Sequence, residues 1–146
     1  MAERTELLMR QNKIISAITS IYSTIDSLVN TKEAFNHVLY ALFMEGGLTQ
    51  KQISVNYGIP VQTVNNAVLS LKEKGFVELK EKPKDRRTKN IILTEKGLEF
   101  AKKQIGAIIA IEKKAISKMG IEKFKTMIEL QELFYASLKE QLPVKA

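Results

Sequence analysis

The sequence of 146 residues contains no cysteine and one histidine, His37. The absence of cysteine excludes disulfides, thiolate metal sites and thiol-based redox sensing within the chain. The sequence also lacks a glycine-rich phosphate loop, a metal-binding histidine pair and a serine, histidine and aspartate set suited to nucleophilic catalysis. A lone histidine beside Val38 and Leu39, in an apolar helical pattern, is typical of a packing or hydrogen-bonding residue. We therefore expect a protein that is not an enzyme and that holds no metal and no cofactor.

Long apolar runs are missing as well. No stretch approaches the ~20 apolar residues that are needed to cross a bilayer. The sequence does not begin with a basic segment followed by an apolar one, as a secretory signal does. We expect a cytoplasmic protein with no membrane partner.

Acidic residues are fewer than basic ones. Lys and Arg total 23 against 16 Asp and Glu, which gives a net charge of +7. This excess favours a polyanionic partner, and nucleic acid and an anionic membrane both qualify. The contents of 45% hydrophobic and 27% charged residues are typical of a folded soluble protein. At this length we expect a single domain over residues 1–146.

Apolar residues at helical spacing predict long helices at both ends of the chain. The expected helices cover residues 6–29, 33–44, 94–120 and 122–142. The last of them carries Leu130 and Leu133 outside its main apolar stripe. Such leftover apolar surface indicates a partner chain.

Two shorter helices are predicted between residues 49 and 74. Thr49 and Gln52 have the spacing of a capping box, so a helix begins at Thr49. Residues 57–60 end this helix with turn chemistry and with a proline that suits the opening of the next one. Gly75 is then expected to cap the second helix. The break between the two helices is short, as in a helix-turn-helix.

The second of these helices has two chemically different faces. The apolar face holds Val64, Ala67, Val68 and Leu71. The opposite or flanking surface holds Gln62, Thr63, Asn65 and Asn66. Asn and Gln side chains can pair with the adenine edge in the major groove, so this surface predicts a DNA-reading helix with a preference for A·T pairs. The alternative interpretation, ordinary surface amides, stays open at this point.

After Gly75 the pattern changes from helical to alternating. Residues 76–80 and 90–93 predict the two strands of a hairpin, with a charged tip over residues 81–89 that does not pack. Residues 80–89 hold six basic and two acidic side chains, a net charge of +4. Asp85 is placed to accept hydrogen bonds from the guanidinium of Arg87. A basic hairpin directly after two such helices favours a winged helix-turn-helix over an ordinary solvated loop.

The stretch over residues 48–97 closely resembles the core of MarR-type transcription regulators. The most specific part is the Asp-x-Arg signature at Asp85 and Arg87, which is followed by a strand and by Leu-Thr-Glu-Lys-Gly at residues 93–97. The resemblance implies a mainly α fold with a small β-hairpin wing. It further implies a homodimer that binds double-stranded DNA as a repressor at an inverted-repeat operator, as well as release by a small-molecule effector.

The resemblance also assigns regions and roles along the chain. A winged helix-turn-helix over residues 33–97 would be flanked by dimerisation helices over 5–29 and 98–142. Base reading falls to Gln62, Thr63, Asn65 and Asn66, the wing contacts to Asp85, Arg86, Arg87 and Lys89, and the phosphate contacts to Thr49, Gln50 and Lys84. Within the wing, Arg87 resembles the minor-groove arginine and Asp85 the acid that braces it, while Arg86 and Lys89 also suit phosphates. The sequence departs from the family because no Arg or Lys stands early in the reading helix, and nothing in it locates an effector pocket.

Two other functions stay open at this stage. An architectural or nucleoid-type DNA-binding protein would use the same basic wing without an operator or a ligand. A membrane-surface protein would carry its basic residues along one face of an amphipathic helix, whereas here they cluster in a hairpin.

Overall fold

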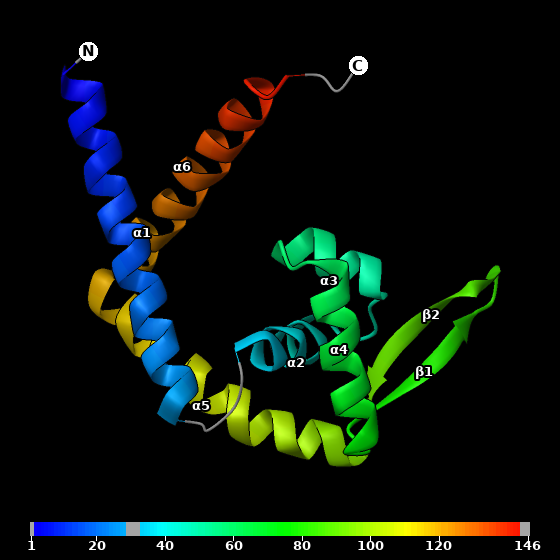
Figure 1. Cartoon of the computed structure of the whole chain (residues 1–146). Helices are drawn as coiled ribbons and strands as arrows, with labels where there is room; N and C mark the ends of the chain where they lie inside the picture. Colours follow the sequence, from blue (N-terminus) through cyan, green and yellow to red (C-terminus); the bar gives the residue numbers. More distant parts are fainter. Residues whose placement is uncertain (1, 29–32, 144–146) are drawn as a thin grey trace. The chain divides into compact units, whose positions relative to one another are not determined.

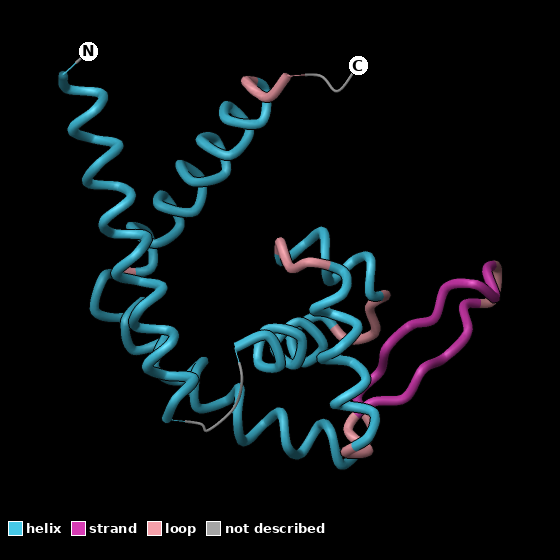
Figure 2. Tube along the Cα trace, in the orientation of Figure 1, coloured by secondary structure: helices cyan, strands magenta, loops and turns pink. Residues whose placement is uncertain are grey.

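The computed structural model describes residues 2–28 and 33–143. Its elements, in chain order, are α1 (Ala2–Leu28), α2 (Glu33–Glu45), α3 (Gln50–Tyr57), α4 (Val61–Glu73), β1 (Val77–Lys82), β2 (Asp85–Leu93), α5 (Glu95–Met119) and α6 (Ile121–Glu140) (Figures 1 and 2). The two strands form one antiparallel sheet. This confirms the predicted fold class, a mainly helical chain with a small hairpin. Val29, the last residue of the first predicted helix, lies outside the described residues.

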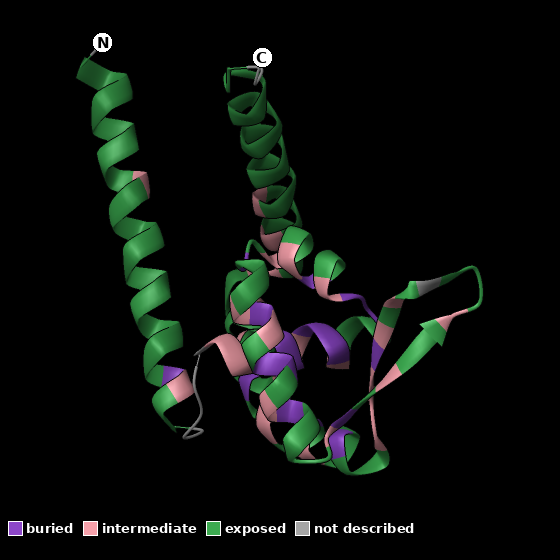
Figure 3. Ribbon diagram, turned by 45° about the vertical axis from the view of Figure 1, so that its right-hand side comes forward, coloured by how far each residue is buried: buried purple, intermediate pink, exposed green. Residues whose placement is uncertain are grey.

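The chain divides into two compact units, Met1–Ala107 and Ile108–Ala146. In the first unit, helices α2, α3 and α4 pack together with the hairpin. The buried side chains that form this core include Val38, Leu39, Leu42, Ile53, Val64, Leu71 and Ile91 (Figure 3). The backbones of Leu48 and Ile91 exchange two hydrogen bonds, of 3.3 and 2.8 Å, which fasten the entry to α3 onto β2.

The start and end of α3 follow from local sequence signals. The Thr49 side chain accepts a hydrogen bond from the backbone N–H of Gln52, and the Gln52 side chain accepts one from the backbone N–H of Thr49, so the predicted capping box is confirmed. Gly58 ends the helix in the left-handed region at φ 62°. Tyr57 donates a hydrogen bond to Glu45 at the end of α2. Burial and this carboxylate raise the pKa of the Tyr57 hydroxyl.

The hairpin is longer than the alternation of apolar residues predicts. Strand pairing continues through Lys80↔Asn90 and Glu81↔Lys89 to Lys82↔Asp85, with an irregularity between Glu81 and Lys82. The predicted strand bounds, 76–80 and 90–93, are therefore too short, whereas the described residues of the tip over 81–89 include no buried side chain, in agreement with the prediction that it does not pack. An exposed two-stranded ribbon is held by backbone hydrogen bonds, and its charged side chains can remain in water, so strand formation there does not require an apolar pattern.

A compact junction joins the end of α4, the start of β1 and the start of α5. The Thr94 hydroxyl donates to the carbonyl oxygen of Gly75 at 2.7 Å and accepts from the backbone N–H of Gly97 at 3.0 Å. The rings of Phe76 and Phe100 stack with centroids 4.3 Å apart. Gly97 lies so close to this turn that an added Cβ would come within 1.8 Å of the Phe76 carbonyl oxygen. The hairpin and α4 are thus both held by the junction at the start of α5.

The helices at the two ends of the chain are much more exposed. In α1, Ile25 is buried, and Asp26 accepts a 2.7 Å hydrogen bond from Asn36 of α2. Within its described range, α6 contains no buried residue (Figure 3). None of the described helices has a stretch long and apolar enough to span a membrane. His37 lies exposed on α2, so of its two predicted roles, packing and hydrogen bonding, the packing role is wrong.

Candidate nucleic-acid interface

Helix α4 buries one face and exposes the other, as its sequence predicts. Its buried residues are Val64, Ala67, Val68 and Leu71. Gln62 and Asn66 are exposed, and Thr63 and Asn65 are half-buried. The four predicted base readers thus lie outside the buried face of α4. Their polar groups are at the protein surface.

The amides of this surface are paired in two different ways. Gln62 donates from Nε2 to Oδ1 of Asn66 at 3.1 Å, one turn further along α4. Gln50, the first residue of α3, donates from Nε2 to Oδ1 of Asn65 at 3.2 Å. The second hydrogen bond connects a predicted phosphate contact on one helix with a predicted base reader on the other.

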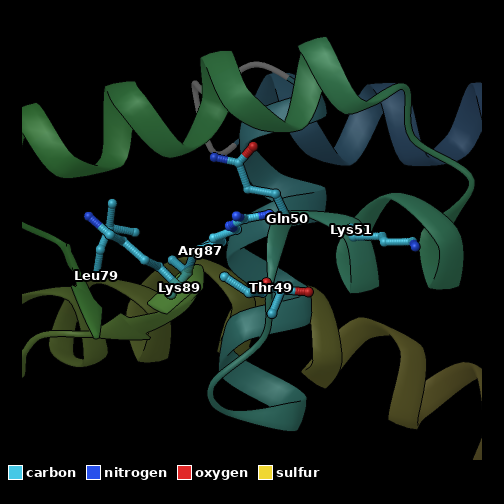
Figure 4. A pocket seen from close by; sticks show the side chains of 8 residues that line it. Thr49, Gln50, Lys51, Leu79, Arg87 and Lys89 are labelled. Atoms are coloured by element: carbon cyan, nitrogen blue, oxygen red, sulfur yellow. The ribbon is translucent and has the colours of Figure 1, made fainter. Parts of the chain in front are cut away.

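A groove of about 330 Å³ lies between the start of α3 and the hairpin (Figure 4). Its lining residues are Thr49, Gln50, Lys51, Leu79, Arg87, Thr88, Lys89 and Ile91. Figure 4 shows Arg87 reaching from the strand towards the start of α3, where Gln50 lies. The groove therefore combines three cations with the amino end of a helix, whose backbone N–H groups carry partial positive charge. Its electrostatics suit an anion such as a phosphate group.

Asp85 acts on the backbone of Arg87 rather than on its guanidinium. Its Oδ1 accepts from the backbone N–H of Arg87 at 3.0 Å, and its Oδ2 accepts from the Thr88 hydroxyl at 2.8 Å. These two hydrogen bonds, first that from Thr88 and then that from Arg87, hold the pKa of the Asp85 carboxyl below its ordinary value. The predicted contact between Asp85 and the Arg87 guanidinium is corrected accordingly. A side-chain oxygen two residues before an N–H is well placed for such a turn, and the guanidinium instead lines the groove.

The remaining predicted residues differ in their positions. Thr49, 5% exposed, caps α3 from the floor of the groove. Lys89 is exposed beside Arg87 on β2, and Lys84 is exposed in the turn between the strands. Arg86 lies in β2, and its side chain is outside what the structure describes. Gln50, Arg87 and Lys89 thus meet in the groove, whereas Lys84 belongs to the far end of the hairpin.

Lys51 and Thr88, which are not among the predicted site residues, also line the groove. Lys51 stands in the first turn of α3, where a cation is unfavourable beside the helix dipole. The sequence therefore contains a signal for an anionic partner, a lysine at this position. Thr88 follows Asp85 at the spacing of a side-chain-stabilised turn. This spacing can also be recognised in the sequence alone. Across residues 2–28 and 33–143, no cluster of three or more metal-ligating side chains occurs.

The helix pair and most of the hairpin match a known protein family. Residues 37–88, which run from α2 into β2 and include the whole helix pair and most of the hairpin, match the model of the MarR family. The central part of the chain is therefore similar to the MarR family. Proteins of this family are DNA-binding regulators rather than enzymes. No curated protein matches the chain by sequence.

Solved structures extend the MarR-family likeness along the chain. NMB1585, a MarR family regulator from Neisseria meningitidis, has a TM-score of 0.76 and 25% identity, covering 92% of this chain and 98% of that one. MepR of S. aureus, in its DNA-binding conformation, has a TM-score of 0.76 and 21% identity, with coverages of 88% and 98%. PcaV of Streptomyces coelicolor, solved with its natural ligand, has a TM-score of 0.67 and 18% identity, with coverages of 86% and 91%. This chain therefore has the winged-helix fold of MarR-family transcriptional regulators.

Proposed function

We propose that this protein is a transcriptional regulator of the MarR type, that it binds double-stranded DNA sequence-specifically as a homodimer, and that it represses from an inverted-repeat operator. The observation that supports this best is the position of two surfaces on one compact unit. The exposed amides of α4 can contact bases, and the groove with Lys51, Arg87 and Lys89 can contact phosphates. The structure of MepR in a DNA-binding conformation agrees with a DNA-binding role for this fold.

Helix α4 is the reading helix of the proposal. Its width and exposed amides fit the major groove, where Gln62, Asn65 and Asn66 can meet base edges and the Thr63 methyl can touch a thymine methyl. The first turns of α4 carry no Arg or Lys to read guanine. We therefore expect an operator rich in A·T pairs, with discrimination that rests on amide hydrogen bonds.

The hairpin and the start of α3 supply the electrostatic part of binding. Backbone N–H groups at the start of α3, together with Gln50 and Lys89, hold phosphates on either side of the groove. Arg87 is exposed, so rotation about its side-chain bonds can carry the guanidinium from the groove into a narrow minor groove. Lys84 and Arg86 add charge along the wing.

The exposed apolar residues of the end helices support the homodimer. Those with at least 40% exposure include Leu7, Ile14, Ile18 and Ile21 on α1 and Leu130, Leu133, Phe134 and Leu138 on α6. A monomer rarely leaves so much apolar side-chain surface in water. Two-fold symmetry would place two reading helices about one DNA turn apart, which matches an inverted repeat. The proposal includes release by a small-molecule effector, and the similar structure of PcaV is that of a transcriptional regulator in complex with its natural ligand.

Selection of bound duplexes from a random-sequence pool tests the proposal. We expect enrichment of a short A·T-rich inverted repeat that binds two chains. A matched selection with Asn65→Ala/Asn66→Ala should recover far less sequence preference while still retaining DNA. If the wild-type chain retains DNA without enriching any sequence, operator binding is wrong.

An architectural DNA-binding function is the second candidate, and the charge distribution favours it. Residues 80–89 carry a net charge of +4, whereas the exposed face of α4 carries its basic residue in the last turn, at Lys72. A protein that binds through charge alone should show strong salt dependence and no preferred sequence. The same selection therefore separates the two candidates.

A further inference from the structure

The hydrogen bond between Gln50 and Asn65 joins the two helices of the helix-turn-helix at the proposed reading surface. Gln50 Nε2 donates to Asn65 Oδ1 at 3.2 Å across 15 residues of sequence. Gln50 stands directly after the capping residue Thr49, in a turn that the capping box fixes. Both amides are half-buried rather than fully exposed. The donor of this hydrogen bond is therefore held at the capped start of α3, outside α4 itself.

A side-chain amide can present either of two chemistries to a base. Its oxygen accepts hydrogen bonds and its NH2 group donates them, and rotation about the terminal bond exchanges the two. A donor fixed on another helix selects one of these orientations. Because Gln50 holds the oxygen of Asn65, the NH2 group of Asn65 is directed away from Gln50.

The other amide pair of the surface lacks such an external anchor. Gln62 and Asn66 are both exposed and lie one turn apart on the same helix. Pairs at this spacing contribute only about 0.2 to 0.5 kcal/mol in isolated helices. Either member of this pair can exchange its partner for a base, whereas Asn65 is oriented by a neighbour that belongs to α3.

We propose that Gln50 is a positioning residue for base recognition: it orients Asn65 so that Asn65 donates to an acceptor atom on a base edge. The acceptors available in the major groove are N7 of a purine, O6 of guanine and O4 of thymine. This inference rests on the proposed function, because it concerns how the reading helix chooses a base. It also gives Gln50 a role in specificity in addition to its predicted phosphate contact.

Two substitutions at Gln50 test the orientation. Gln50→Met removes the donor, so Asn65 can rotate, and discrimination at one base pair of each half-site should fall about tenfold. Gln50→Glu offers only acceptors, so Asn65 should turn its NH2 group towards residue 50 and its oxygen towards the DNA. The preference at that base pair should then shift to a base with a donor, adenine N6 or cytosine N4. The introduced Met and Glu are both good helix formers, and Glu suits the first turn of a helix.

Lys51→Met is the matched control for Gln50→Glu. Both variants lower the net charge by one within the same groove, but Lys51 donates no hydrogen bond to Asn65 among the contacts of the described chain. The control should weaken binding to all duplexes by a similar factor and leave the base preferences unchanged. A change at a single base pair in Gln50→Glu alone then identifies orientation rather than charge.

A double-mutant cycle completes the test. In an Asn65→Ala background, Gln50→Met should have no further effect on discrimination, because its influence passes through Asn65. Unchanged base preferences in Gln50→Met, or an equal loss at every position, would overturn the inference while the wild-type operator still supported the proposed function. If the wild-type chain selects no sequence, both the proposed function and this inference are wrong.

Discussion

The reading helix and the hairpin present opposite chemistries from the same compact unit. Gln62, Thr63, Asn65 and Asn66 of α4 are uncharged hydrogen-bonding residues, and residues 80–89 concentrate a net charge of +4. Contacts to phosphates position a protein on DNA without carrying sequence information, whereas contacts to base edges carry it. Under the proposed function, this difference would place affinity and selectivity in separate elements of the protein. Each could then be altered without the other.

The two surfaces share one support, and breaking it should produce the largest effect. We expect Gly97→Ala to lower the free energy of unfolding by about 3 kcal/mol, since the added Cβ would lie 1.8 Å from the Phe76 carbonyl oxygen and the backbone would have to move. Chemical denaturation measures this change. DNA binding through both surfaces should weaken together.

Gly106→Ala is the control for this prediction, because nothing lies within 4 Å of the added Cβ and the residue is in helix α5. Alanine is the better helix former, so the variant should gain about 0.5 to 1 kcal/mol of stability. Equal effects of the two substitutions would show that the junction is not the common support.

Removing the groove arginine should reduce affinity by a similar factor on the selected and the scrambled duplex. We expect Arg87→Ala to cost about 1 to 3 kcal/mol of binding free energy on each, and to lower the slope of log affinity against log salt by about 1. Fluorescence anisotropy over a range of salt concentrations gives both quantities. Arg87→Lys should retain the slope, because it keeps the charge. An unchanged affinity in Arg87→Ala would remove this residue from the interface.

Removing the side-chain amides of Asn65 and Asn66 should lower sequence discrimination rather than overall affinity. In Asn65→Ala/Asn66→Ala, discrimination between the selected duplex and a scrambled one should fall by about 1 to 3 kcal/mol, while binding to the scrambled duplex changes little. Competition binding measures this difference. Equal losses on both duplexes would assign these residues a general role in contact and would remove the distinction between the two surfaces.

The smallest effect concerns the end of the hairpin. Because the folded pKa of Asp85 is lowered, its carboxylate contributes stability above the unfolded pKa and loses that contribution as pH falls through the folded value. Exchange of the Arg87 backbone N–H should therefore be protected at neutral pH and become faster, relative to the intrinsic rate, only below about pH 4.

Asp85→Ala should remove that protection at all pH values. Glu81→Ala, which deletes the same charge from the paired strand, is the control and should retain the protection of the Arg87 amide. Hydrogen exchange followed by NMR distinguishes them. A pH dependence that persists in Asp85→Ala would assign the protection to another group.

Most of the fold could be predicted from local signals. Thr49 with Gln52 marks the start of α3, Gly75 marks the end of α4, and each signal acts through neighbouring backbone groups. The two faces of α4 follow in the same way from helical periodicity. Such features depend on residues a few positions apart, so a single sequence contains them.

Features that depend on distant or competing partners could not be predicted in the same way. The spacing of Asp85 and Arg87 gives proximity, but it does not decide between a backbone N–H and a guanidinium as the donor. The hydrogen bond from Gln50 to Asn65 depends on how two helices cross, which periodicity does not specify. The length of the hairpin was missed because backbone pairing leaves no apolar pattern in charged strands.

The most direct test of separate surfaces is the salt dependence of affinity for the selected and scrambled duplexes, measured side by side for the wild-type protein. If charge supplies affinity and amides supply selectivity, both affinities fall steeply with salt, and their ratio stays nearly constant. A ratio that collapses towards one as salt rises would show that the charged hairpin carries the selectivity, which would contradict the assignment of base reading to α4.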